Sequence, residues 1–275
     1  MPDEPSATGE GTDYYDSLYG HFAEDLHASI RREAFGEEIG QSSWLTADEH
    51  RLFFGWLGLD ASSEVLDVAS GSGGPALFMA RTTGCRVTGV ELHQAGVDAA
   101  NVAATSAGRA DRVRFLRADA REPLPFGDAT FDAAMCIDSI NHLYERQRLL
   151  DEWYRVVRPG GRILFTDPIT VTGLLRRDEM IARSAGMGEF VFTPMGADEE
   201  MIRRAGFVDI VVEDRTANVE RVADGWAAAR DRRSEALERL EGAEASASLT
   251  DFLGVVASLA RERRLSRPAY VARRP

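Results

Sequence analysis

Residues 65–76 read Val65-Leu66-Asp67-Val68-Ala69-Ser70-Gly71-Ser72-Gly73-Gly74-Pro75-Ala76, and the apolar start Leu77-Phe78-Met79 follows directly. The apolar run predicts a buried strand. The glycines predict a tight turn, because glycine tolerates φ > 0 and lets a ligand approach the backbone closely. Pro75 suits the first turn of a helix, whose free N–H groups face back toward the turn. The pattern therefore predicts a strand–turn–helix unit that cradles a nucleotide or nucleoside.

The glycine spacing alone leaves two classes of ligand open. Gly71-x-Gly73-x-x-Ala76 also satisfies the fingerprint of dinucleotide-binding proteins, so a nicotinamide-dependent dehydrogenase is an alternative. Asp67 argues against that alternative, because a carboxylate at the end of the first strand repels a pyrophosphate. The same carboxylate suits a ligand that carries an ammonium or sulfonium group.

Composition narrows the class of partner. The chain has 275 residues, which predicts one α/β domain with helical additions. Its 32 basic and 45 acidic residues give a formal net charge of −13, which argues against nucleic acid or an anionic membrane surface. Cys85 and Cys136 have no metal-binding spacing, and the N-terminus lacks the basic and apolar regions of a signal peptide. These features predict a cytoplasmic protein with a small-molecule partner and no metal site.

The order of elements predicts the fold class. Residues 1–12 are expected to be a disordered tail, residues 13–58 a helical N-terminal cap, and residues 59–275 the ligand-binding domain. Apolar strands alternate with amphipathic helices from residue 65 to residue 167, which predicts a Rossmann-like, mostly parallel sheet with helices on both faces.

The C-terminal third departs from that alternation. Residues 170–200 are rich in Met and Phe and are expected to form a lid insertion over a pocket. Beyond it we expect a helix at 197–205, a strand at 207–214, a long helix at 221–240 and an edge strand at 269–272.

Four carboxylates end successive predicted strands, at Asp67, Glu91, Asp119 and Asp138. Ligands bind beyond the carboxyl ends of the strands in open parallel sheets, so these side chains are expected to meet at one site. Glu91 is placed to accept both ribose hydroxyls, and Asp119 with the Ala120 amide to read an adenine edge. The competing interpretation is that each acid caps the helix that follows it, which is harder to apply to four acids in order.

These motifs resemble those of the class I S-adenosylmethionine-dependent methyltransferases. The resemblance covers about residues 35–215 and rests on residues 65–73, Glu91, Ala118-Asp119, Phe131-Asp132 and Arg158-Pro159-Gly160-Gly161. Ala69 departs from the glycine that is usual there. The resemblance implies S-adenosyl-L-methionine as cofactor, with binding residues Ser43, Asp67, Ala69, Gly71, Gly73, Glu91, Leu92, Asp119, Ala120 and Ile137.

Within that family the chain is most similar to phosphoethanolamine and sarcosine or dimethylglycine methyltransferases, through residues 35–39, Ser42-Ser43 and residues 138–143. In the phosphoethanolamine group an aspartate and a histidine at this spacing line the active site, and an N-terminal tyrosine closes over it. The resemblance implies Asp138 and His142 for that pair and, among Tyr14, Tyr15 and Tyr19, favours Tyr19. Pro168 stands where that group has a phosphate-contacting tyrosine, so phosphoethanolamine is not the expected substrate.

The expected reaction is transfer of a methyl group to N or O, with C as a variant, of a small-molecule metabolite or natural-product intermediate. Such a transfer needs an aligned nucleophile and a group that removes its proton. We expect His142 to be that base, because an imidazole titrates near neutral pH, and Asp138 to hold its tautomer or to contact the cofactor. The alternatives are a packing role for His142, the dehydrogenase, and a protein that binds S-adenosylmethionine without methylating. The sequence does not predict an oligomeric state.

Overall fold

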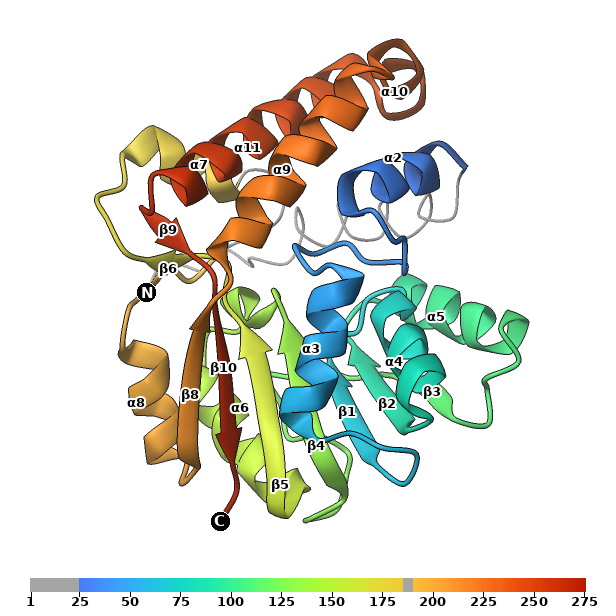
Figure 1. Cartoon of the computed structure of the whole chain (residues 1–275), viewed down its shortest axis with the longest axis vertical. Helices are drawn as coiled ribbons and strands as arrows, with labels where there is room; N and C mark the ends of the chain where they lie inside the picture. Colours follow the sequence, from blue (N-terminus) through green and yellow to red (C-terminus); the bar gives the residue numbers. More distant parts are fainter. Residues whose placement is uncertain (1–24, 185–189) are drawn as a thin grey trace, which may run out of the picture.

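A seven-stranded sheet forms the centre of the part of the chain that the computed structural model describes, residues 25–184 and 190–275 (Figure 1). Its spatial order is β3-β2-β1-β4-β5-β10-β8. All neighbours are parallel except that β10 runs antiparallel to both β5 and β8. The strands are β1 (Glu64–Val68), β2 (Arg86–Glu91), β3 (Val113–Arg117), β4 (Phe131–Ile137), β5 (Val157–Thr166), β8 (Val208–Asp214) and β10 (Pro268–Arg273). The predicted Rossmann-like class is confirmed.

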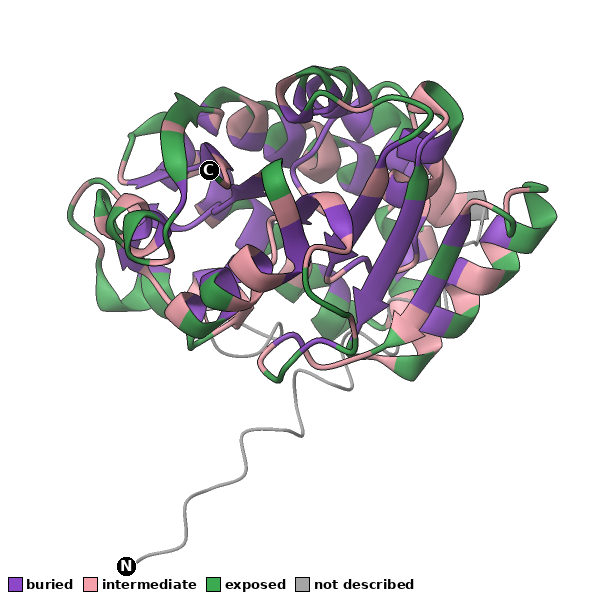
Figure 2. Ribbon diagram, turned by 90° about the horizontal axis from the view of Figure 1, so that it is seen from below, coloured by how far each residue is buried: buried purple, intermediate pink, exposed green. Residues whose placement is uncertain are grey.

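Helices cover both faces of this sheet because its central strands are apolar on both sides. Along β1, Val65 packs into one hydrophobic cluster, whereas Leu66 and Val68 pack into a second cluster on the opposite face. Figure 2 shows these strands buried within a partly exposed helical shell. This continuous apolar pattern is typical of parallel strands that are buried on both faces. One face carries α3 (Ala47–Leu57), α4 (Gly74–Thr83) and α5 (Gln94–Ser106), and the other carries α6 (Arg146–Val156) and α8 (Ala197–Arg204).

A layer of helices lies above the carboxyl ends of the parallel strands (Figure 1). Ala34, Phe35 and Trp44 of the N-terminal part share one buried cluster with Val222 and Phe252 of the C-terminal helices. Segments about 200 residues apart in sequence therefore form this layer together, and we call it the helical roof. It consists of α2 (Asp25–Phe35), α9 (Thr216–Asp231), α10 (Ser234–Glu241) and α11 (Ala243–Arg261).

The structure corrects the long helix predicted at residues 221–240. The chain turns after Asp231, and α10 folds back so that the buried Arg230 guanidinium donates two hydrogen bonds to Glu241, at 3.1 and 2.6 Å. Helix α11 was not predicted. Its sequence carries the signal nonetheless, since apolar residues recur at helical spacing from Leu249 to Ala260 and are buried or half-buried.

The edge strand predicted at residues 269–272 is wrong in its position. Strand β10 lies inside the sheet between β5 and β8, and β8 occupies the edge. Tyr270 explains this placement, since its ring stacks on Phe165 of β5 with a centroid distance of 4.8 Å and is 1% exposed.

The predicted insertion at 170–200 lies between β5 and α8, except that its last four residues already belong to α8. The insertion contains β6 (Thr170–Val171), α7 (Arg177–Ser184) and β7 (Thr193–Pro194), and β6 pairs with β7 and with β9 (Leu265–Ser266) in a second, small sheet. The predicted tail at residues 1–12, residues 13–24 of the predicted cap, and Met187 lie outside the described residues. No helix within the described ranges is long and apolar enough to cross a membrane.

Gly74, at the start of α4, is a position where the fold needs glycine. A Cβ there would lie 2.3 Å from the Ile39 carbonyl oxygen and 2.5 Å from the Gly40 backbone. We expect Gly74→Ala to lower the free energy of unfolding by about 1–3 kcal/mol, because backbone must move to admit the methyl group. Chemical denaturation measures this change.

Gly55 in α3 provides the matched control. An added Cβ there meets nothing within 4 Å, so Gly55→Ala should leave stability unchanged or raise it by up to about 1 kcal/mol. Equal effects of the two substitutions would contradict the close approach at Gly74.

Candidate active site

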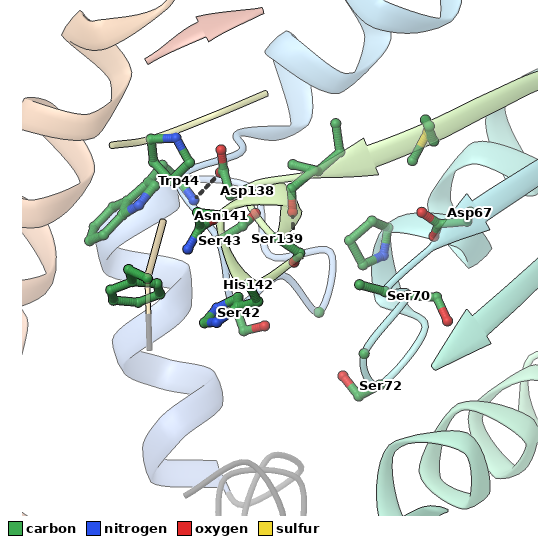
Figure 3. Close-up of a pocket in the computed structure, with 18 of the residues that line it drawn as sticks. Ser42, Ser43, Trp44, Asp67, Ser70, Ser72, Asp138, Ser139, Asn141 and His142 are labelled. Carbon is green, nitrogen blue, oxygen red and sulfur yellow. Dashed lines mark hydrogen bonds between the residues drawn. The ribbon is translucent and has the colours of Figure 1, made fainter. Parts of the chain in front are cut away.

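A pocket opens at the carboxyl ends of β1 and β4, beneath the helical roof. Its space, including the part open to solvent, is about 1070 Å³. Figure 3 shows Asp67, Ser70 and Ser72 on one side of it and Trp44, Asn141 and His142 on the other. The first side is the glycine-rich turn after β1. The second is lined by aromatic residues of several elements.

The turn after β1 has the backbone conformation that the glycine pattern predicts. Gly71 and Gly73 have φ of 55° and 80°, and Ala69 has φ of 58°. A side chain in this left-handed region costs about 1–2 kcal/mol, so Ala69 adopts the conformation at a cost that glycine would avoid. Gly73 is the N-cap of α4 and makes no side-chain cap hydrogen bond. Pro75 has no N–H and the Leu77 N–H donates to the Gly73 carbonyl, so Gly74 and Ala76 carry the first-turn N–H groups that Gly73 does not cap.

Asp67 is a buried acid on the wall of this pocket. It is 4% exposed, and its carboxylate accepts no hydrogen bond from residues 25–184 or 190–275. Burial, aided by the nearby charge of Glu91, raises the pKa of Asp67 to about 7. A positively charged ligand beside Asp67 would stabilise the ionised carboxylate, which burial otherwise destabilises.

Glu91 supports the turn from the neighbouring strand. One carboxylate oxygen accepts the Gly71 N–H and the other accepts the His93 N–H, both at 3.0 Å. Glu91 as a whole is 5% exposed. Glu91 therefore fixes the turn after β1 directly, which is a role that sequence reasoning did not assign to it.

The predicted cofactor residues divide into two groups in the structure. Ser43, Asp67, Ala69, Gly71 and Ile137 line the pocket, together with the predicted catalytic residues Asp138 and His142. Gly73, Glu91, Leu92, Asp119 and Ala120 are not among its lining residues, and the Asp119 carboxylate is ion-paired with Arg121 at 2.6 Å. Their contact with a cofactor stays a prediction. Tyr19 lies outside the described residues.

Asp138 is held by a buried network. Its Oδ1 accepts hydrogen bonds from Arg267 Nε at 2.6 Å and Thr166 Oγ1 at 2.7 Å, and its Oδ2 accepts the Trp44 N–H at 2.9 Å. Arg267 is fully buried and also donates to both carboxylate oxygens of Glu49 at 2.9 Å. The Arg267 guanidinium therefore compensates the charge of Asp138 beside the pocket. Arg267 and Glu49 were not predicted as site residues.

His142 lies in the short 3₁₀ turn η1 (Ile140–His142), half-buried on the pocket wall. Its ring packs on Phe190 with a centroid distance of 4.7 Å. Phe190 comes from the insertion at 170–200, so the predicted base and the predicted lid meet at one side of the pocket.

Further lining residues were not predicted. Arg183 comes from α7, Trp226 from α9, and Leu249 and Phe252 from α11. The aromatic residues and Leu249 had a usable signal in the amphipathic spacing of these helices. Arg183 lies in the segment that was expected to form a lid, but nothing in the local sequence singled out this residue.

Comparison with known proteins places these features in a family. Residues 66–165 match the Methyltransferase domain family. The chain is 31% identical over 243 residues to the 27-O-demethylrifamycin SV methyltransferase of Amycolatopsis mediterranei, covering 83% of this chain and 88% of that protein. It is 28% identical over 218 residues to the sarcosine/dimethylglycine N-methyltransferase of Halorhodospira halochloris, covering 77% and 74% of the two chains.

A solved structure shares the fold. The phosphoethanolamine N-methyltransferase 2 of Haemonchus contortus, in complex with S-adenosyl-L-methionine, superimposes with a TM-score of 0.80 at 22% identity. The match covers 95% of this chain and 60% of that one. Together with the glycine-rich turn and the acids at the strand ends, these similarities show that the chain belongs to the S-adenosylmethionine-dependent methyltransferases.

Proposed function

We propose that this enzyme transfers a methyl group to O or N, with C as a variant, of a small-molecule metabolite or natural-product intermediate. The observation that carries the proposal is the two-sided pocket. One side offers the turn after β1 and the Asp67 carboxylate to the cofactor, and the other offers aromatic walls and His142 to the acceptor. The O-methyltransferase and N-methyltransferase relatives both support a small-molecule acceptor.

The residues of the first side fit S-adenosyl-L-methionine. Asp67 is buried without a hydrogen-bond partner among the described residues, so it suits the positive charges of that cofactor. The same carboxylate argues against the pyrophosphate of a nicotinamide cofactor, and nothing in the comparisons favours the dehydrogenase. When bound, S-adenosyl-L-methionine supplies an electrophilic methyl group on a sulfonium.

The second side of the pocket would supply orientation and a proton acceptor. Trp44, Phe190 and Phe252 exclude water and orient a flat acceptor, which supports in-line attack. His142 would take the proton of the acceptor's hydroxyl or amine group. Because the Asp138 carboxylate is bound by Arg267, Thr166 and Trp44, we propose that Asp138 shapes the end of β4 beside the reacting groups.

The lid, the closing tyrosine and the cellular location that the sequence predicts stay proposals. Arg183 and Phe190 of residues 170–200 line the pocket, which supports a lid role for that insertion. Tyr19 is proposed to close the site from the N-terminal side. A reducing cytoplasmic location is supported by Cys85 and Cys136, which are buried free thiols.

The proposed reaction is tested with radiolabelled S-adenosyl-L-methionine and a panel of small acceptors that carry hydroxyl or amine groups. Label should pass to at least one acceptor and not to a protein or nucleic acid. Binding of S-adenosylhomocysteine without transfer to any acceptor would favour the non-methylating alternative.

Substitution of Glu91 should remove cofactor binding. We expect Glu91→Ala to weaken S-adenosylhomocysteine by at least about a hundredfold in calorimetry, because charge-assisted hydrogen bonds to the ribose and to the Gly71 N–H are lost together. Glu213→Ala, on the exposed edge strand β8, is the control and should bind as the wild type does. Unchanged affinity of Glu91→Ala would remove Glu91 from the site.

Replacing Asp67 by a neutral residue should raise the stability of the protein and weaken its binding of the cofactor. With a folded-state pKa of about 7 against an ordinary value of 3.8, Asp67 holds its proton more tightly in the folded state. Its contribution to stability therefore falls as pH rises from about 4 to about 7. We expect Asp67→Asn to raise the free energy of unfolding by up to about 4 kcal/mol at pH 8, and much less near pH 4.

Denaturation at the two pH values measures this difference, and calorimetry should show weaker S-adenosylhomocysteine binding by Asp67→Asn. A variant with the wild-type pH dependence of stability would show that Asp67 ionises normally.

His142 should affect turnover without affecting the cofactor. We expect His142→Ala to lower turnover by about a hundredfold or more on any acceptor that the wild type methylates, while S-adenosylhomocysteine affinity stays within about threefold. His27→Ala in α2, whose ring lies 3.6 Å from Glu241, is the control and should keep full activity. Wild-type turnover in His142→Ala would leave His142 a packing residue.

A further inference from the structure

Asn141 is a buried polar residue on the pocket wall whose side chain makes no hydrogen bond with the described residues. It lies in η1 beside His142 and is 2% exposed. Its Oδ1 accepts no hydrogen bond and its Nδ2 donates none within residues 25–184 and 190–275. A buried carboxamide left in this state destabilises the folded protein. Hydrogen bonds from a bound molecule would remove that penalty.

A second asparagine shows how the same fold holds a structural carboxamide. Asn101 in α5 donates from Nδ2 to the Phe115 carbonyl oxygen and accepts the Phe115 N–H at Oδ1, both at 3.1 Å. These two hydrogen bonds join α5 to β3, and Asn101 does not line the pocket. Asn141 makes no such pair among the described residues, so its carboxamide does not hold two elements together.

Asn141 belongs to the acceptor side of the pocket. Figure 3 shows it on the same side as Trp44 and His142, across from Asp67. Its backbone carbonyl oxygen accepts the Val191 N–H at 2.8 Å, which fixes η1 against the insertion at 170–200. Because no hydrogen bond holds either amide atom, rotation about the Cβ–Cγ bond can present Oδ1 or Nδ2 to a ligand. The carboxamide is therefore placed where the body of an acceptor would lie beside the proposed base.

We propose that Asn141 is a specificity-determining residue and that the acceptor bears a neutral amide group that pairs with its carboxamide. This inference rests on the proposed function, because it assigns the acceptor side of the same pocket. An amide carries an N–H donor next to a carbonyl acceptor, so two facing amides form two hydrogen bonds. A carboxylate offers only acceptors, and an apolar group offers neither, so each would leave the Asn141 Oδ1 unpaired.

The position of the amide sets the orientation of the acceptor. Asn141 and His142 are adjacent in the chain and both line the pocket. An acceptor whose amide pairs with Asn141 would be held at a fixed distance from the His142 ring. Its reacting hydroxyl or amine would then face the proposed base, which supports in-line attack.

The test uses three flat probes in calorimetry, each added to the enzyme saturated with S-adenosylhomocysteine. The first, 6-hydroxy-2-naphthamide, carries the proposed amide. The second, 2-naphthol, lacks it, and the third, 6-hydroxy-2-naphthoate, replaces it with a carboxylate of nearly the same shape. Each probe is added to the wild type and to Asn141→Leu, which removes the carboxamide and keeps a similar volume.

The wild type should bind the naphthamide at least about tenfold more tightly than naphthol or the naphthoate, because a site built for an amide is left unpaired by the other two. Asn141→Leu should lose at least about tenfold in affinity for the naphthamide and change less than about threefold for naphthol. S-adenosylhomocysteine affinity should be the same in both proteins.

Thermal unfolding supplies a readout that separates recognition from a structural role, with Asn101→Leu as the matched variant. Asn141→Leu should keep or raise the Tm, because it removes an unpaired buried group. Asn101→Leu should lower the Tm by about 2 °C or more, because two hydrogen bonds are lost. A comparable loss in Asn141→Leu, or its failure to fold, would make Asn141 a structural residue and overturn the inference.

Three binding results would also overturn it. One is a wild type with no preference for the naphthamide, including one that binds none of the probes. Another is a preference for the naphthoate, which would make the acceptor anionic. The third is a loss of S-adenosylhomocysteine affinity in Asn141→Leu, which would place Asn141 on the cofactor side. Failure of the wild type to bind S-adenosylhomocysteine would instead overturn the proposed function itself.

Discussion

The buried ion pairs of Arg267 constrain the rest of the structure. This guanidinium has no exposed surface and binds Asp138 at the end of β4 and Glu49 in α3, while Arg267 itself lies directly before β10. Removing one partner from such a group typically costs about 3–5 kcal/mol, because the remaining charge stays buried without compensation. Three segments far apart in the chain must therefore come together as a unit. The Arg267 N–H also donates to Thr216 Oγ1 at the start of α9, so the same residue joins the helical roof to the strand ends beside the pocket.

The parallel half of the sheet could be predicted because its signals are local. A strand such as β1 is a short apolar run that carries an acid near its carboxyl end and is followed by a glycine-rich turn, and each of these features is visible within a few residues. The position of β10 could not be predicted in this way. Its place depends on pairing with β5 and β8 and on the stacking of Tyr270 against Phe165, which are contacts between residues more than 50 positions apart.

The residues of the candidate site likewise fall into those with a local sequence signal and those placed by tertiary packing. Asp67, Gly71 and Asp138 were predicted because parallel strands bring their carboxyl ends to one edge, whereas His142 was named through the resemblance to the phosphoethanolamine group. Arg183, Trp226 and Phe252 were missed because they belong to helices that reach the pocket only through tertiary packing. The side of the pocket formed by the glycine-rich turn was thus partly predictable from sequence, whereas most of the aromatic side was not.

The two carboxylates on the pocket wall, Asp67 and Asp138, differ in how their charge is compensated. Asp67 has no hydrogen-bond partner within the described ranges, and burial raises its pKa. Ionisation of Asp67 therefore lowers the free energy of unfolding, and a cationic cofactor bound beside it would offset that loss. Asp138, by contrast, has Arg267, Thr166 and the Trp44 N–H around its carboxylate, so it adds little net charge between the two sides. Of the two residues expected to carry the chemistry, His142 is then better placed to accept a proton, because both carboxylate oxygens of Asp138 are already engaged.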